Sequence, residues 1–137
     1  MPRENGTPST RRIAAAALLV AGAGVCACSA ALHPAALAPP PRAAPDRVLL
    51  APATARLPTG GPETLPAGTV LAHRGRIAQG EVWRPLDRAM TVPVDSSDAH
   101  EGWVVLSGDL WVGFYLPVAR AFTPLRRPVP VATRGRA

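Results

Sequence analysis

The chain has 137 residues, of which 17 are proline, 12 are glycine and only six are aromatic, so it can build no more than one small hydrophobic core. Its formal charge is +6 and its basic residues are all arginines. Arginine without lysine, together with abundant alanine and proline, is typical of a GC-rich genome. The scattered charges therefore do not by themselves indicate nucleic-acid binding.

Residues 1–28 have the layout of a bacterial export signal. Arg11 and Arg12 supply a positive start, an apolar run follows over residues 13–25, and small residues end the segment. The apolar run is shorter than the roughly 18 residues that a membrane-spanning helix needs. The sequence therefore predicts a signal peptide with a short signal helix.

Both cysteines lie where this segment ends, in the sequence Val25-Cys26-Ala27-Cys28-Ser29. This order resembles the lipobox of bacterial lipoproteins, with a branched aliphatic residue three positions before Cys28 and a small residue just before it. The resemblance implies that Cys28 is lipidated, that the protein is held to a membrane through fatty-acyl chains, and that it faces the periplasm. It also implies the outer membrane, because Ser29 is not the aspartate that favours inner-membrane retention.

Two alternatives to lipidation stay open. Ordinary cleavage near Ala31 or Ala38 would leave the mature protein with a free thiol or none. If the apolar run is extended to Leu32, the segment becomes an uncleaved membrane anchor.

Residues 29–66 contain nine of the prolines and no aromatic residue. Such a composition buries too little apolar area to offset chain entropy, and it favours extended conformations. We therefore expect a disordered Pro/Ala-rich tether. Val48-Leu49-Leu50 is the one hydrophobic spot in it, and a short strand there is the alternative.

Residues 67–125 contain every aromatic residue and are the predicted folded domain. Strands are expected over residues 68–78, 81–86 and 90–94, with Pro85 and Pro93 at strand ends or edges because they lack ladder donors. The pattern predicts a mainly β fold, a small antiparallel meander or open barrel. A domain of about 60 residues is marginally stable, so partner binding or a homo-oligomer is a reasonable supplement.

The organising element of this domain is a hairpin over residues 102–124. A two-residue turn at Gly108-Asp109 pairs Trp103 with Phe114. A turn at Ser107-Gly108 is the alternative, and it would shift the pairing by two residues while leaving the same residues on the same face. Alternation places one apolar set on the core face: Trp103, Val105, Leu110, Val112, Phe114 and Leu116. The other face carries Val104, Leu106, Trp111 and Tyr115, with a gap at Gly113 that another group could fill. Trp111, Tyr115 and Trp83 are the predicted interaction surface.

Residues 95–101 form the most polar stretch of the domain, with carboxylates, hydroxyls and His100 next to Glu101. The spacing matches no calcium loop, zinc helix or nucleophile elbow. We therefore expect a solvated loop, with no metal, no cofactor and no catalytic residue. A hydrolase that uses His100 and Glu101 is the minor alternative, and His73 is expected to be a surface strand residue.

Residues 126–137 carry Arg126, Arg127, Arg134 and Arg136 and no acidic residue. We expect a basic, disordered tail that touches anionic phospholipid or cell-wall polymer. Nucleic acid is not an expected partner, because an exported protein is poorly placed to meet it.

The order of features resembles a set of short proteobacterial lipoproteins of uncharacterised function. The residues that carry this likeness are residues 79–85, 100–101, 113–117 and 122–125, which read QGEVWRP, HE, GFYLP and FTPL. The resemblance implies a lipobox, a proline-rich spacer and a small carboxy-terminal β domain. We expect a structural or interaction module of the cell envelope, and not an enzyme; a periplasmic small-molecule or polymer binding protein is the alternative.

Overall fold

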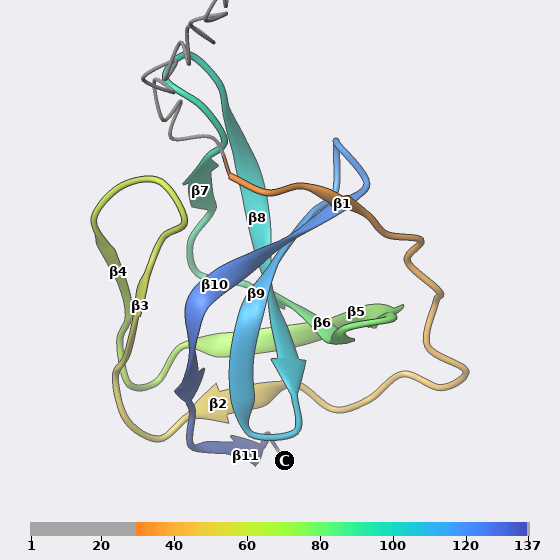
Figure 1. The fold of residues 1–137 in the computed structure, drawn as a ribbon. Helices are drawn as coiled ribbons and strands as arrows, with labels where there is room; N and C mark the ends of the chain where they lie inside the picture. Colours follow the sequence, from red (N-terminus) through yellow and green to blue (C-terminus); the bar gives the residue numbers. More distant parts are fainter. Residues whose placement is uncertain (1–29, 137) are drawn as a thin grey trace, which may run out of the picture.

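The computed structural model describes residues 30–136, and over this range the chain is entirely β, with no helix (Figure 1). Within these residues, no helix has the length and the apolar character needed to cross a membrane. The strands are β1 (His33–Pro34), β2 (Arg47–Leu49), β3 (Ala53–Arg56), β4 (Pro62–Leu65), β5 (Val70–Ile77), β6 (Gly80–Pro85), β7 (Met90–Pro93), β8 (Ala99–Ser107), β9 (Leu110–Leu116), β10 (Ala121–Pro130) and β11 (Thr133–Gly135).

The main sheet is an antiparallel meander in the order β1-β10-β9-β8-β6-β5-β2-β11. Only Val131 and Ala132 separate β10, which pairs with β9, from β11, which pairs with β2. One continuous stretch of chain therefore links the two sides of the sheet and curls it into a small, incompletely closed barrel (Figure 1). The predicted antiparallel β fold is confirmed, and Pro85 and Pro93 end β6 and β7.

The hairpin of β8 and β9 has the expected two-residue turn, since Ser107 pairs with Leu110 and Gly108 has a φ of +60°. Its register differs from the prediction. Val105 pairs with Gly113 but Leu106 pairs with Trp111, so Val112 is an extra residue in a β-bulge. As a result Trp103 lies opposite Tyr115, and Phe114 lies opposite Val104.

This bulge overturns the predicted core face, because one extra residue reverses which side of the sheet the following side chains face. The main core takes Val104, Leu106 and Trp111 before the bulge and Phe114 and Leu116 after it. The other face holds a smaller set, Trp103, Val105, Val112 and Tyr115. The gap at Gly113 is filled by Phe122, whose ring would lie 2.5 Å from a Cβ at that position.

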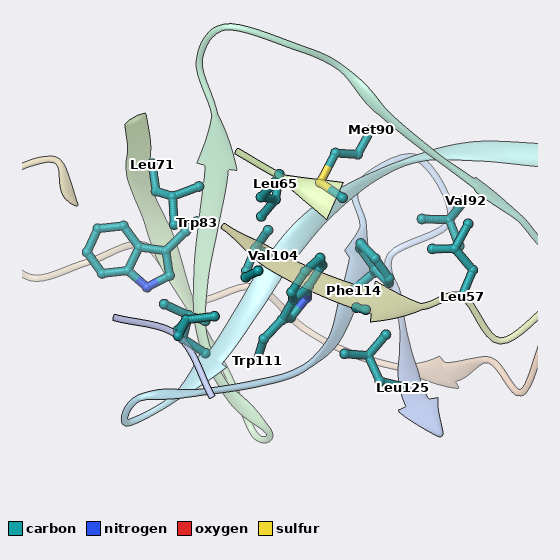
Figure 2. Close-up of a cluster of buried hydrophobic side chains, with 14 of the residues drawn as sticks. Leu57, Leu65, Leu71, Trp83, Met90, Val92, Val104, Trp111, Phe114 and Leu125 are labelled. Carbon is teal, nitrogen blue, oxygen red and sulfur yellow. The ribbon is translucent and has the colours of Figure 1, made fainter. Parts of the chain in front are cut away.

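The main core lies inside the barrel, with Trp111 and Phe114 in the middle, Trp83 and Leu71 at one end, and Val92 and Leu57 at the other (Figure 2). The β3–β4 hairpin covers part of it. Several residues of the expected tether are buried in this main core: Leu49, Ala53, Ala55, Leu57 and Leu65.

The prediction of a disordered tether is therefore wrong for residues 30–66. The segment has no aromatic residue, but it is rich in alanine and leucine, and alternate residues of β3 face the core. The short-strand alternative at Val48-Leu49-Leu50 is borne out by β2. Prolines do not prevent this packing, since Pro34 ends β1, Pro62 begins β4, and Pro39, Pro40 and Pro41 lie outside the strands.

A second, smaller cluster packs on the outer face of the hairpin. Its buried members are Ile77, Val82, Val105, Tyr115 and Phe122, and Ala35 and Leu37 pack against them from the segment before β2. Backbone hydrogen bonds fix this segment: Ala35 N–H donates to Arg120 O over 3.0 Å, and Ala38 and Arg76 exchange two bonds of 2.9 Å. The hairpin is thus covered on both faces.

The predicted disordered tail is also wrong as far as residue 136. β10 continues to Pro130, Val131 is buried, and β11 extends the sheet. The predicted domain boundaries at residues 67 and 125 are consequently too narrow, because residues on both sides of them pack into the main core or into the second cluster.

Candidate functional site

The three residues predicted to form an interaction surface are buried. Trp83 is 2 % exposed, Trp111 0 % and Tyr115 4 %. Trp111 packs edge-on against Phe114 with ring centroids 5.4 Å apart, and its indole N–H donates to the Gly113 carbonyl over 3.1 Å. The prediction of an exposed aromatic surface is therefore wrong, because the aromatic residues serve the core.

The polar loop of residues 95–98 is organised by its own side chains. The Oδ1 atom of Asp95 accepts hydrogen bonds from the Ser97 backbone N–H over 2.8 Å and from the Ser97 hydroxyl over 3.0 Å. These bonds favour the ionised carboxylate and lower the pKa of Asp95 below its ordinary value of 3.8. The loop is a self-contained turn.

His100 and Glu101 do not form an acid–base pair. They are neighbours on β8, so their side chains point to opposite faces. His100 Nε2 lies 3.1 Å from Asp98 Oδ2, whereas Glu101 accepts the indole N–H of Trp103 over 3.1 Å and lies 3.8 Å from Arg84. Each group is engaged with a different partner, and this removes the geometric support for a hydrolase at this position.

Two further expectations concern metal binding and lipidation. Within residues 30–136, no three His, Cys, Asp or Glu side chains gather in a way that could hold a metal ion. Cys28, the predicted lipidation site, lies outside the described residues.

A pocket that sequence reasoning missed opens between the β5–β6 hairpin, β2 and the β8–β9 turn. Its volume is about 240 Å³, and it is lined by Arg47, Arg76, Glu81, Trp83, Leu106 and Gly108. Trp83 and Leu106 are buried core residues and form an apolar floor. We call Arg47, His73, Arg76, Glu81 and Trp83 the barrel-mouth cluster.

A bulge in β5 assembles this cluster. His73 pairs with Trp83 and Gly75 pairs with Val82, so Arg74 is an extra residue. Without the bulge, His73 and Arg76 would face opposite sides, because three positions separate them. With it, both reach Glu81: His73 Nε2 lies 3.4 Å from Oε2, and Arg76 donates to Oε1 over 2.8 Å. A glycine inside a strand is a sequence signal for a bulge, and Gly75, whose φ is +144°, could have indicated this one.

The side chain of His73 is 8 % exposed, so the prediction of a surface residue is wrong. Its ring lies 4.7 Å from that of Trp83. Neither ring nitrogen has a hydrogen-bond partner, because the 3.4 Å approach to Glu81 lies within ion-pair distance but lacks hydrogen-bond geometry. His73 thus supports the Trp83 and Glu81 side chains from below the pocket, and it is not one of the residues that line it.

Arg47 of β2 also contacts Trp83. Its guanidinium sits 5.1 Å from the centroid of the indole ring and donates to the Thr133 hydroxyl over 3.3 Å. The cation–π contact fixes the guanidinium plane while leaving other N–H groups to face a ligand. The cluster therefore combines an aromatic floor, two guanidinium groups, an imidazole and one carboxylate.

Comparison of the chain with protein-family models, with curated proteins and with solved structures found no match. The candidate site consequently rests on its own geometry.

Proposed function

We propose that this chain is an exported lipoprotein of the bacterial cell envelope, anchored at Cys28, facing the periplasm from the outer membrane, and acting as an interaction module. The observation that supports the proposal is the packing of the residue next but one to Cys28. Ala30, two positions after Cys28, is buried, and its N–H donates to the Val94 carbonyl over 2.8 Å. Cleavage before Cys28 would leave this domain whole.

The short spacing between Cys28 and Ala30 would also set which end of the domain faces the membrane. Two residues span at most about 7 Å, so a lipidated Cys28 holds the barrel close to the bilayer at Val94, near the start of β8. β8 runs from Ala99 to Ser107, which corresponds to about 25 Å at ~3.3 Å per residue. Gly108, just beyond its far end, lines the pocket of the barrel-mouth cluster. The anchored protein would thus present this cluster away from the membrane (Figure 1).

The size of this pocket favours a side chain or an end group over a whole small molecule as its occupant. At about 240 Å³ it is smaller than the ~300–1,000 Å³ of typical small-ligand sites. One acidic side chain or end group of an envelope protein or polymer would fit. Arg47 is the group that would pair with it, because Arg76 already holds Glu81.

The anchor is tested by intact mass and membrane partitioning of the protein from its native host. Wild type and the matched control Cys26→Ala are expected to carry a triacyl-sized mass and to sediment with membranes, whereas Cys28→Ala loses both. An unmodified thiol in wild type, or equal membrane association of Cys28→Ala, would contradict the proposal.

The recognition site is tested by in vivo crosslinking from a photoreactive amino acid placed at position 76, whose native side chain is 71 % exposed. We expect a discrete adduct that disappears when Arg47→Glu is added and is absent when the probe is placed at Arg42, an exposed residue outside the cluster. An adduct insensitive to Arg47→Glu, or identical from position 42, would exclude the barrel-mouth cluster as the binding surface.

A further inference from the structure

β10 leaves its ladder where it carries two adjacent arginines. Pro124 pairs with Gly113 and Val129 with Trp111, so residues 125–128 of β10 lie opposite Val112 alone. Pro128, inside this stretch, has no N–H to donate, so it cannot contribute a donor to the ladder with β9.

The bulge of β10 is held in place at both ends. Leu125 is buried in the main core, and Val129 packs against that core, while Arg126 and Arg127 between them are exposed. A bulge of this kind redirects side chains out of the sheet. The two arginines are thus displayed from a fixed backbone and not from a free tail.

A third arginine faces them from the β3–β4 hairpin, which lies beside β10 (Figure 1). Thr54 and Arg56 of β3, with Arg126, Arg127 and Val129 of β10, line a cavity of about 520 Å³. We call this the arginine groove. Its residues are all different from those of the barrel-mouth cluster.

The groove carries positive charge without compensation from a nearby acid. No carboxylate of the described residues lies within ion-pair distance of Arg56, Arg126 or Arg127. Glu63 of β4 pairs with Ala55, so it lies on the face of the hairpin opposite to Arg56. Three like charges around one cavity raise its potential, and a bound anion would lower the repulsion.

We propose that the arginine groove binds the phosphate group of a phosphorylated ligand. Guanidinium groups present planar pairs of N–H donors that match phosphate oxygens bidentately, and a phosphate has enough oxygen atoms for three arginines. The site is independent of the proposed anchor and of the barrel-mouth cluster. The phosphate comes either from a lipid headgroup or from a soluble phosphorylated molecule.

The test uses the full chain in detergent and two probes, pyrophosphate and the phospholipid headgroup analogue glycerophosphoglycerol, titrated by calorimetry. Binding of at least one probe is expected. The double variant Arg126→Gln/Arg127→Gln should weaken this binding by more than about tenfold, because each substitution removes charge-assisted hydrogen bonds. The matched control is Arg42→Gln/Arg134→Gln, which removes the same charge from exposed positions outside the groove.

The two probes distinguish the sources. Binding of pyrophosphate alone indicates a soluble ligand, and binding of glycerophosphoglycerol indicates a lipid headgroup; either result supports the groove if only the Arg126/Arg127 variant loses it. Absence of binding to both probes, or equal loss in the control variant, would overturn the proposal. Thermal unfolding of each variant checks that the fold is intact, and Arg56→Gln provides a second groove variant from a different strand.

Discussion

The two faces of the β8–β9 hairpin are buried in different ways. One face places Trp111 and Phe114 in the main core, where both are 0 % exposed and several strands surround them. The other face holds Tyr115 in a smaller cluster that is closed by Ala35 and Leu37 from the segment before β2. The difference shows that a proline-rich segment without aromatic residues can cover one face of the hairpin when its small apolar side chains fill specific positions.

Trp111→Ala is expected to give the largest loss, since it empties the centre of the better-packed face. We expect the free energy of unfolding to fall by about 3–5 kcal/mol in chemical denaturation. Leu110→Ala, at a neighbouring side chain that is 42 % exposed, is the control and should change it by less than about 1 kcal/mol. Equal effects of the two variants would mean that Trp111 is not the centre of the core.

Gly75→Ala should displace the segment before β2, which covers the outer face of the hairpin. A Cβ at this position would lie 2.2 Å from the Ala38 carbonyl oxygen, and the φ of +144° is itself strained for alanine. The segment around Ala38 must move away, and we expect a loss of about 1–3 kcal/mol. Limited proteolysis should detect faster cleavage within residues 33–40.

The control for this variant is Gly61→Ala, which would meet nothing within 4 Å. It should leave the proteolysis pattern unchanged. If Gly75→Ala is cleaved no faster than wild type, the two hydrogen bonds between Ala38 and Arg76 do not hold the segment.

Leu37→Ala removes one apolar side chain from the segment that covers the outer face of the hairpin, and it does not alter the backbone. Because Leu37 is only partly buried, we expect a loss of about 1 kcal/mol in chemical denaturation. Leu32→Ala, at a side chain that is 39 % exposed, should cost less. The opposite ranking would indicate that Leu37 does not pack on the hairpin.

The smallest effect is expected at Asp95, whose loop follows the Val94 carbonyl that receives the Ala30 N–H. The hydrogen bonds from Ser97 lower the pKa of Asp95, so the folded state binds this proton less readily than the unfolded state. The resulting stability is present above pH 3.8 and is lost as the pH falls through the lower folded-state value. Asp95→Asn should therefore be slightly less stable than wild type at neutral pH, and the difference should vanish in acid. A difference that does not change with pH would contradict this origin.

The sequence was sufficient to predict the strands from β5 to β9 and the Gly108-Asp109 turn, because alternation and turn chemistry are local signals. It was not sufficient for the faces of the hairpin, since Gly113, the residue next to the bulge at Val112, was interpreted as a gap between aromatic residues and not as the mark of a bulge. The packing of residues 30–66 was missed because a composition is an average over the segment. The average does not show the individual positions that pack, such as Leu49 in the main core and Leu37 against the hairpin.

The barrel-mouth cluster was missed for a related reason. It brings Arg47 of β2 beside Trp83 of β6, and only the strand order of the sheet places them together. His73 looked like an isolated surface residue because its partner Glu81 depends on the bulge at Arg74.

Amide hydrogen exchange of the full chain would show directly whether the segment before β3 is packed on the domain. The N–H groups of Ala35, Ala38 and Leu49 donate to Arg120, Arg76 and Thr69 carbonyls over 3.0, 2.9 and 2.9 Å. We expect all three to exchange more slowly than in an unstructured peptide of the same sequence, and Gly75→Ala to release Ala38 first. Exchange of all three at the unstructured rate, with the hairpin amides still protected, would contradict the central claim and restore a free tether.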